Sequence, residues 1–260
     1  MVSAAVPAGD RLQTTFEDLV DTLRMFIRRH RITSEEFRLA TQTIVDSIEA
    51  GEGTMIFDTF LEADVADVAT VDGGSPHSMA GPFYRAGAPV LTSPCALPRR
   101  ADEGGEALIF KGSVRNVRGE LLPNAELDIW QADATGGYSQ FDPEPPPWNL
   151  RGLVRADDDG NFEVATITPP PYEIPTGGPT GAILRALGRH AFRPAHLHVI
   201  VRSPGHMPLT AQLYFPGGEY LDNDAVDAVR DGLVMETERG PSGLIARFDF
   251  VLAHRAQSDA

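Results

Sequence analysis

The stretch 193–201 constrains this chain more than any other, because it places two histidines two positions apart in a segment with strand character. Side chains of a strand alternate between its two faces, so His196 and His198 share one face while Leu197 and Val199 occupy the other. The β-branched residues that end the segment favour a strand over a helix. Two imidazoles on one face can hold one metal ion. From this pair alone, metal binding and ordinary packing remain equally open.

Composition excludes several classes of protein. The chain has 260 residues, 42% of them hydrophobic, which suffices for a substantial core in one or two domains. Its formal charge of −15 repels phosphate backbones, so we expect no nucleic-acid partner. Cys95 is the one cysteine of the sequence, which fits a cytoplasmic protein without internal disulfides. No apolar run reaches the ~20 residues that cross a bilayer, and the first ten residues lack a signal-peptide pattern. We expect no membrane association.

The first 72 residues have the periodicity of helices. Apolar side chains recur at three- and four-residue steps over residues 11–30, 37–48 and 55–68. Thr33 to Glu36 has the pattern of a capping box, and Gly51 and Gly53 separate the second helix from the third. The three apolar faces pack either on the rest of the chain or on a second copy of it. The sequence leaves both alternatives open.

From residue 73 onward, glycine and proline separate short apolar runs, which is typical of a sandwich or barrel of strands. Strands are expected at residues 110–114, 125–130, 162–167, 196–201, 211–215 and 244–252. Residues 157–161 lack the later acidic ligands of a calcium loop and are interpreted as a hairpin turn. We therefore predict a mostly β protein with an α-helical N-terminal segment, divided into residues 1–72 and a β-sandwich over 73–260.

Two tyrosines occupy positions suited to a functional group. Tyr138 follows two glycines, and Tyr172 follows three consecutive prolines. Stiff loops can fix the direction of a side chain, although a half-buried aromatic with a hydrated hydroxyl is the ordinary alternative. Phenolate and imidazole ligands suit oxidised iron, whereas zinc normally takes a third histidine, a cysteine or a carboxylate. An iron site, a zinc hydrolase and a metal-free ligand-binding β-sandwich remain as hypotheses.

The chain resembles the intradiol ring-cleaving dioxygenases of the catechol 1,2-dioxygenase family over about residues 10–250. The residues that carry the resemblance are Gly81-Pro82-Phe83-Tyr84, Leu127 to Asp133, Gly136-Gly137-Tyr138, Asn149-Leu150-Arg151-Gly152, Gly188-Arg189-His190 and Arg193 to His198. An HxH motif preceded by Arg-Pro-Ala, with two tyrosines upstream, is a specific combination.

The resemblance implies a helical region through which two subunits associate and a β-sandwich with one non-haem Fe(III) per subunit. The implied iron ligands are Tyr138, Tyr172, His196 and His198. Arg193 matches the guanidinium that lies against the substrate ring, and Gln212 matches the active-site glutamine. Alternation from His196 would turn Arg193 to the other face, but Pro194 interrupts it. Here Thr210-Ala211 precedes the glutamine, where the family usually has Thr-Thr. A lipid between the subunits is also implied.

The implied reaction joins an aromatic diol with O2 and opens the ring between the two hydroxylated carbons. Catechol would give a cis,cis-muconate-type diacid and hydroxyquinol would give maleylacetate, as in the catabolism of aromatic compounds. Tyr172 would leave the metal as substrate binds and carry off one substrate proton. Arg193 would stabilise negative charge on the ring, with an ion pair to an acidic side chain as its alternative role.

The resemblance also implies the residues that line the substrate pocket. They are Met55, Asp58, Met79, Ala80, Pro82, Phe83, Ile174, Pro175, Arg193, Ala225 and Val226. Several of them resemble hydroxyquinol 1,2-dioxygenases, and Asp58 would accept a hydrogen bond from a third hydroxyl unless it is simply solvated. Residues 214–219 resemble the chlorocatechol branch instead. We expect catechol or a substituted catechol as substrate, with hydroxyquinol favoured among the latter and chlorocatechol as the alternative.

Overall fold

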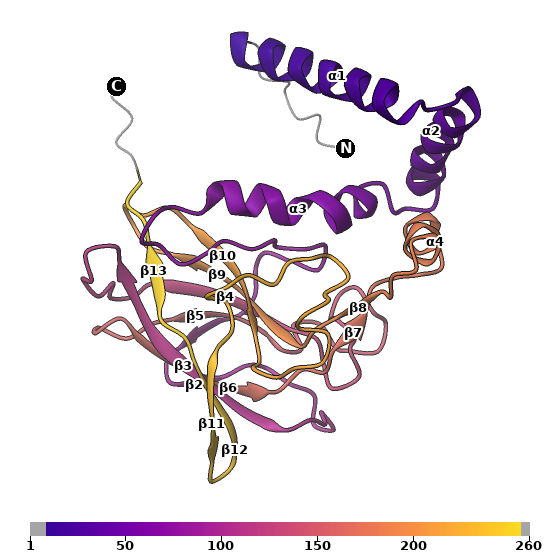
Figure 1. Cartoon of the computed structure of the whole chain (residues 1–260). Coiled ribbons are helices and arrows are strands. Elements are labelled where there is room, and N and C mark those ends of the chain that lie inside the picture. The colour runs from indigo at the N-terminus through magenta and orange to yellow at the C-terminus, as the bar shows by residue number, and fades with distance from the viewer. Residues whose placement is uncertain (1–8, 256–260) are drawn as a thin grey trace. The chain divides into compact units, whose positions relative to one another are not determined.

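The computed structural model describes residues 9–255, which divide into two compact units, one up to Gly53 and one from Thr54 onward (Figure 1). The first unit contains α1 (Asp10–His30) and α2 (Ser34–Glu49). The predicted capping box is present, because the Thr33 hydroxyl accepts the Glu36 N–H and the Glu36 carboxylate accepts the Thr33 N–H. Within the described residues of this unit, Ser47 alone is buried in its two helices. The expected helices form, but their apolar faces stay exposed.

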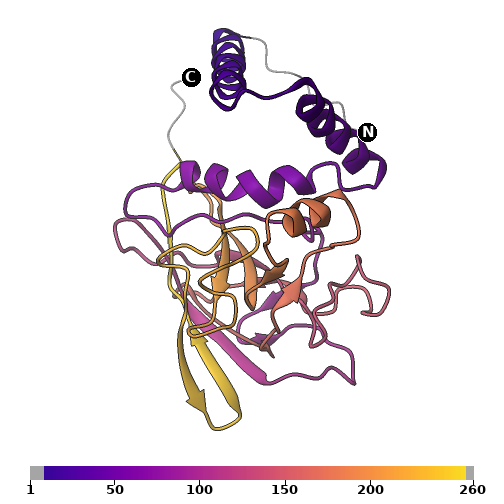
Figure 2. The same ribbon diagram turned by 45° about the vertical axis from the view of Figure 1, so that its right-hand side comes forward.

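The third helix, α3 (Met55–Ala69), belongs to the second unit. The division between compact units therefore lies at residue 53, whereas the sequence pattern placed it at residue 72. Packing explains the difference: Ala63 belongs to a cluster of buried apolar residues in the second unit, and the partly buried Phe60 packs against this cluster. Arg230 also donates to the Asp67 carboxylate near the end of the helix. α3 lies beside α4 (Pro179–Ala186) in both views (Figure 1, Figure 2).

Two sheets form the rest of the second unit. The first has the order β1-β5-β4-β9-β10, and the second has the order β11-β12-β3-β6-β2 with β13 also paired to β3. The first sheet contains β1 (Val90–Thr92), β5 (Arg151–Arg155), β4 (Glu126–Trp130), β9 (His196–Arg202) and β10 (Leu209–Tyr214). The second contains β11 (Glu236–Gly240), β12 (Gly243–Arg247), β3 (Ala107–Asn116), β6 (Asn161–Ile167), β2 (Cys95–Ala96) and β13 (Phe250–Leu252). A separate pair joins β7 (Tyr172–Glu173) to β8 (Phe192–Arg193).

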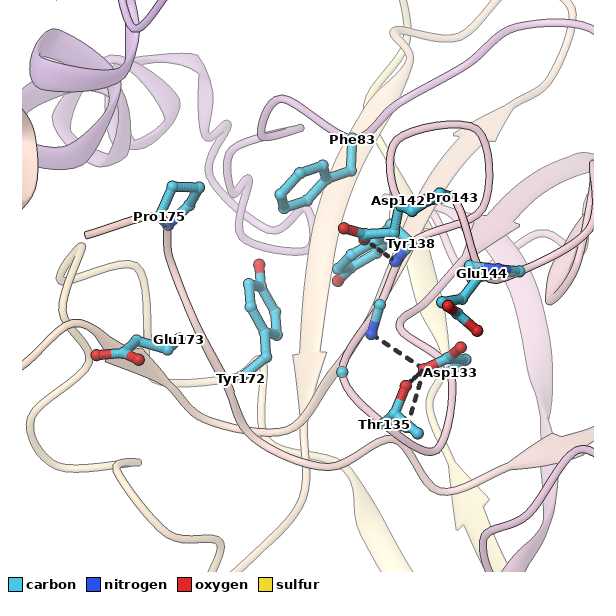
Figure 3. Close-up of a pocket in the computed structure, with 13 residues that line it drawn as sticks. Phe83, Asp133, Thr135, Tyr138, Asp142, Pro143, Glu144, Tyr172, Glu173 and Pro175 are labelled. Carbon is cyan, nitrogen blue, oxygen red and sulfur yellow. Dashed lines mark hydrogen bonds between the residues drawn. The ribbon is translucent and has the colours of Figure 1, made fainter. Parts of the chain in front are cut away.

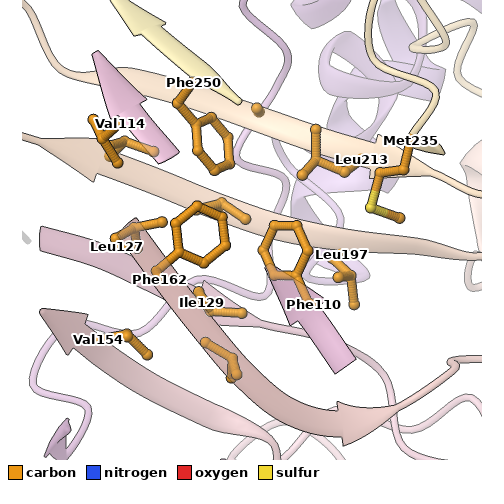
Figure 4. Packing of buried hydrophobic residues seen from close by; sticks show 14 of the residues in the cluster. Phe110, Val114, Leu127, Ile129, Val154, Phe162, Leu197, Leu213, Met235 and Phe250 are labelled. Atoms are coloured by element: carbon orange, nitrogen blue, oxygen red, sulfur yellow. The ribbon is translucent and has the colours of Figure 1, made fainter. Parts of the chain in front are cut away.

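The main core lies between the two sheets, as the alternation of side chains requires (Figure 4). Leu197 and Val199 of β9 project into it from one sheet, and Phe110 and Phe162 project from the other. All four side chains are at most 2% exposed. Because one face of β9 fills this core, the histidines of β9 lie on its opposite face. The prediction of a β-sandwich with N-terminal helices is confirmed. None of the helices in the described residues is both long and apolar enough to cross a membrane.

The strand expected at residues 244–252 is two strands, both parallel to β3. β12 pairs with the first half of β3, the chain then bends at Phe248 and Asp249, and β13 pairs with the second half. Gly112 of β3 makes the bend possible, because a Cβ there would lie 1.8 Å from the Phe248 carbonyl oxygen. The periodicity of side chains contains no signal for this close approach.

The predicted hairpin at residues 157–161 is wrong, although a tight turn is present. The Asp157 carboxylate accepts the N–H groups of Asp159 and Asn161. The turn joins β5 to β6, which belong to different sheets, so it links the two layers of the sandwich. The strands β1, β2, β5, β7, β8 and β11 were not predicted. In β5 the pattern is obscured because Arg151, a charged residue, is 1% exposed.

Candidate metal centre

The two histidines of β9 lie on the same face and point their ring nitrogens at each other. Their Nε2 atoms are 3.0 Å apart, and both side chains are at most 2% exposed. His196 donates from Nδ1 to the Pro194 carbonyl oxygen at 2.7 Å, because a carbonyl can only accept. This bond leaves the Nε2 lone pair of His196 free to bind a cation. His198 lies between Trp130 and Gln212 of the neighbouring strands, with its ring stacked on Trp130 at 4.7 Å.

Tyr138 is held by the loop that follows β4. Asp133 caps this loop by accepting the N–H groups of Thr135 and Gly137, and Asp142 accepts the N–H of Tyr138 itself at 2.6 Å. Gly136 has φ of +91°, a conformation that glycine adopts most readily. The ring of Phe83 stacks on that of Tyr138 at 4.4 Å. These contacts fix a phenol that is 1% exposed.

Tyr172 enters the site from β7 rather than from a loop, and its strand partner is Arg193 of β8. Figure 3 shows the phenols of Tyr172 and Tyr138 beside each other, with Phe83 next to both. The ring centres of the two tyrosines are 5.4 Å apart. The ring centre of Tyr172 is 5.5 Å from that of His196, and the ring centre of Tyr138 is 6.0 Å from that of His198. Three separate segments thus bring all four predicted ligands together.

This donor set fits a metal ion. Two nitrogen ligands about 2.1 Å from one ion and at right angles lie about 3.0 Å apart, which matches the two Nε2 atoms. The buried hydroxyl of Tyr138 has no hydrogen-bond partner of good geometry among the described residues, although the Tyr172 phenol lies beside it. Such a group costs about 1–3 kcal/mol when it stays unpaired, and a cation bound to its oxygen would offset this cost. The four donors therefore suit a cation that is held at their centre.

The electrostatics favour neutral imidazoles and a cation-dependent phenolate. Burial, reinforced by Arg193, lowers the pKa of His196 to about 3. Burial, with His196 and Arg193 nearby, also lowers the pKa of His198 well below its ordinary value. Both rings are therefore neutral near pH 7, as metal ligands must be. Burial and the neighbouring Tyr172 raise the pKa of Tyr138 well above its ordinary value, so Tyr138 would ionise only beside a strong positive charge.

The zinc alternative lacks the ligands that zinc prefers. Over residues 9–255, no group of three or more His, Cys, Asp and Glu side chains is placed to hold one ion. The histidine pair is completed by phenols, which are oxygen ligands suited to a hard, oxidised cation. The donor chemistry at this site therefore favours ferric iron over zinc.

Arg193 lies next to the four donors, on the same side as the histidines. Its guanidinium donates to the Gln212 side-chain oxygen at 2.7 Å and to the Tyr214 hydroxyl at 3.2 Å. It also forms an ion pair with Asp224, in which both side chains are at most 3% exposed. Burial opposes the charged form of Arg193, but Asp224 outweighs it, and the pKa of Arg193 is raised well above its ordinary value. Pro194 and Ala195 separate β8 from β9, so strand alternation does not apply to Arg193.

A mostly apolar cavity adjoins Arg193 and Tyr172. It is lined by Met55, Asp58, Thr59, Met79, Pro82, Phe83, Tyr172, Ile174, Pro175, Arg193 and Val226. Nine of the residues that the resemblance implied are among them. Ala80 and Ala225 are not among them: Ala225 is buried beside β8, where its N–H donates to the Phe192 carbonyl.

Three residues of the site were not predicted from the sequence: Tyr214, Thr59 and Asp224. Tyr214 had a signal, because it stands two positions after Gln212 on one strand and so shares its face. Thr59 follows Asp58 on α3 and lines the same cavity. Asp224 had no signal in the sequence, since it is one of 37 acidic residues and lies 31 positions from its partner.

Several known proteins are similar in sequence to this chain. A family model described as "Dioxygenase" matches residues 79–254. The chlorocatechol 1,2-dioxygenase of Rhodococcus opacus is 40% identical over 255 residues, which cover 95% of this chain and 99% of that protein. The chain belongs to the intradiol catechol 1,2-dioxygenase family.

Solved structures of this family have the same fold. The crystal structure of 3-chlorocatechol 1,2-dioxygenase from Rhodococcus opacus 1CP superposes with a TM-score of 0.86 at 36% identity and covers 95% of this chain and 100% of that one. Hydroxyquinol 1,2-dioxygenase from Pseudomonas putida DLL-E4 superposes with a TM-score of 0.87 at 29% identity, over 96% of this chain and 94% of that one. The intradiol dioxygenase family thus includes relatives that are named for different catechols.

Proposed function

We propose that this chain binds one non-haem Fe(III) through Tyr138, Tyr172, His196 and His198 and cleaves a catechol with O2 between its two hydroxylated carbons. The observation that carries the proposal is the meeting of two phenols and two imidazoles beside a cavity that Arg193 lines. Family membership supports the reaction class, and the product would be a cis,cis-muconate-type diacid. The roles of individual residues are our assignments.

The chain's own residues have distinct tasks in this reaction. When bound, ferric iron supplies Lewis acidity and accepts electron density from the diol. The imidazoles of His196 and His198 provide neutral ligands, and the phenol oxygen of Tyr138 provides a fixed anionic one. Tyr172 takes one proton from the substrate at its own oxygen. Arg193, held by Gln212, stabilises the negative charge that develops on the ring.

The space around Tyr172 supports its displacement by substrate. The cavity beside Arg193 measures about 40 Å³, whereas a neighbouring acidic cavity measures about 380 Å³ (Figure 3). Tyr172, Phe83 and Pro175 line both cavities. Movement of the Tyr172 ring would therefore join the two spaces and make room for a diol ring.

We propose chlorocatechol as the preferred substituted substrate. The lining of the cavity is dominated by methionine, proline, phenylalanine, isoleucine and valine side chains, which suit an apolar ring substituent. The name of the Rhodococcus opacus relative and residues 214–219 point the same way. The expected preference for hydroxyquinol has weaker support. Asp58 keeps hydroxyquinol as a second candidate, because its carboxylate lines the cavity and can accept a hydrogen bond.

The test combines metal content, colour and oxygen uptake. We expect one iron per chain, a red-brown solution from phenolate-to-Fe(III) charge transfer, and a spectral shift when catechol is added without O2. Oxygen uptake would then be compared for catechol, 4-chlorocatechol and hydroxyquinol. Zinc without iron, or no oxygen uptake with any of the three diols, would refute the proposal. Faster turnover of hydroxyquinol than of 4-chlorocatechol would reverse the assigned preference.

We also propose that the first unit joins two copies of the chain. Phe16, Leu19 and Leu23 of α1 are 61%, 53% and 51% exposed, and they lie on one face at helical spacing. A contiguous apolar surface of this kind is typical of an interface. The same surface suits a lipid chain between the subunits, and mass spectrometry of a solvent extract of the pure protein would detect it.

A further inference from the structure

We propose that Asp224 is a positioning residue, which orients the Arg193 guanidinium and fixes the Val226 wall of the same cavity. This inference rests on the proposed intradiol function. One buried carboxylate would hold two groups in place: the Arg193 guanidinium, which stabilises charge on the ring, and the Val226 side chain, which forms part of the cavity wall. Asp224 does not line the cavity, and its hydrogen bonds go to Arg193, Val226 and Ala228 rather than to the four metal donors, so it acts through these neighbours.

The bonds to Arg193 use one edge of the guanidinium. Arg193 Nε donates to Asp224 Oδ1 at 3.1 Å, and Arg193 Nη2 donates to Asp224 Oδ2 at 2.9 Å. The second N–H of Nη2 is shared between the Gln212 side-chain oxygen and the Tyr214 hydroxyl. Among residues 9–255, Nη1 donates to no protein acceptor. The edge formed by Nε and Nη2 therefore fixes the plane of the guanidinium. Nη1 can then donate a hydrogen bond to a group bound in the cavity that Arg193 lines.

The same carboxylate orders its own loop. The N–H of Ala228 donates to Asp224 Oδ2 at 3.1 Å, and the N–H of Val226 lies 3.4 Å from Oδ1. Val226 lines the cavity, and Ala225 donates its N–H to the carbonyl of Phe192, the residue before Arg193. The loop 224–228 is thus held to the strand β8 at Phe192 and at Arg193. A shift of the carboxylate would move the guanidinium and the Val226 side chain together.

This arrangement requires a side chain at position 224 that accepts hydrogen bonds at both of its terminal atoms. An ionised aspartate accepts at Oδ1 and Oδ2, and all four groups that face it are N–H donors. Asparagine has nearly the same shape but would turn an NH2 group toward two of these donors. Asp224→Asn therefore removes the orientation of Arg193 with little change of volume.

The decisive experiment is a double-mutant cycle on the iron-loaded enzyme. Asp224→Asn should lower kcat/KM for catechol about 100-fold when Arg193 is present, as expected for a displaced catalytic group. In the Arg193→Gln background the same change should cost less than about 3-fold, because only its effect on the Val226 wall remains once the guanidinium is gone. Equal losses in both backgrounds would overturn the inference. Asp128→Asn is the matched control, because Asp128 is also buried (6% exposed) but accepts a hydrogen bond from Tyr84 and does not line the cavity. The activity of this variant should stay within about 2-fold of that of the wild type.

A structural measurement separates this inference from the proposed function. Crystal structures of the wild-type and Asp224→Asn proteins should show the Arg193 guanidinium and Val226 displaced in the variant. An unmoved guanidinium would refute the role of Asp224 even if the wild-type enzyme is active. A wild-type protein that consumes no O2 would refute the function, while the crystal comparison would still test the positioning. If Asp224→Asn fails to fold, Asp224→Glu advances the carboxylate by one methylene and should lower kcat/KM; an unchanged value would overturn the inference.

Discussion

The two units of this protein use apolar side chains in opposite ways. In the second unit, Phe110, Leu127 and Leu197 are at most 1% exposed, and the sandwich of sheets surrounds them. In the first unit, Phe16, Leu19 and Leu23 are all more than half exposed. The second unit has within itself the contacts that a stable core needs. The first unit has apolar faces that call for contacts from another molecule.

This contrast shows why the metal donors lie where they do. A side chain is aimed accurately when its neighbours cannot move, and the second unit packs both faces of β9. Leu197 and Val199 lock the strand into the core, while His196 and His198 project from its other face. The helices α1 and α2 bury too little to provide such support for a catalytic group.

Removal of a metal donor should have the largest effect. His196→Ala is expected to lower activity at least about 1,000-fold, because the Lewis acid contributes several kcal/mol to the reaction. Iron content and the red-brown colour should fall with it. The midpoint of urea unfolding of the metal-free protein should change little, since the main core is on the other face of β9. If the His196→Ala variant retained iron and activity, β9 would not provide an essential metal ligand.

A pair of phenylalanines compares the two units directly. Phe110→Ala should lower the free energy of unfolding by about 3–5 kcal/mol, because it removes a fully buried ring from the core. Phe16→Ala should change it by less than about 0.5 kcal/mol in a monomeric form of the protein, since Phe16 is 61% exposed there. Urea denaturation of both variants at several protein concentrations measures this difference. Similar losses in the monomer would contradict the contrast.

Charges on the apolar face of α1 should change assembly rather than chemistry. Leu19→Glu combined with Leu23→Glu would place two carboxylates within the proposed interface, where burial of unpaired charge is unfavourable. Light scattering at micromolar concentration should show a dimer for the wild type and a monomer for the variant. Activity per chain should stay within about 2-fold, because these residues lie outside the cavity. Gln13→Glu is a suitable control on the polar side of the same helix. A wild-type monomer would refute the proposed association.

The smallest expected effect concerns substrate choice. Asp58→Ala removes one potential hydrogen-bond acceptor from the cavity and should lower kcat/KM for hydroxyquinol about 10-fold. The value for 4-chlorocatechol should fall less or rise, since the cavity becomes more apolar. Thr59→Ala, at the next position of α3, provides a matched control. Equal losses on both diols after Asp58→Ala would show that Asp58 takes no part in substrate discrimination.

Local patterns predicted much of this molecule. The periodicity of α1 and α2, the capping box at Thr33 and the alternation of β9 depend on neighbouring residues, so the sequence contains them. The resemblance brought together Tyr138, Tyr172, His196 and His198, whose ring groups meet in the structure. Their roles as iron ligands remain a prediction.

Contacts between distant segments were beyond such reasoning. Asp224 and Arg193 are 31 residues apart, and no spacing rule connects a loop aspartate to a particular arginine. The division at Gly53 depends on the packing of Phe60 and Ala63 against side chains from later in the sequence. The short strand β5 carries a buried arginine and a glycine, so its composition gave no sign of a strand.

Gly112 sets a strict condition on how this enzyme can be altered. The backbone of residues 248–249 rests against it so closely that even a methyl group would collide with a carbonyl oxygen. A saturation library across β3 should therefore recover glycine alone at this codon, although the position is remote from the metal donors. The residues of the cavity wall can therefore be varied, whereas the close crossing of residues 248–249 over Gly112 must be kept.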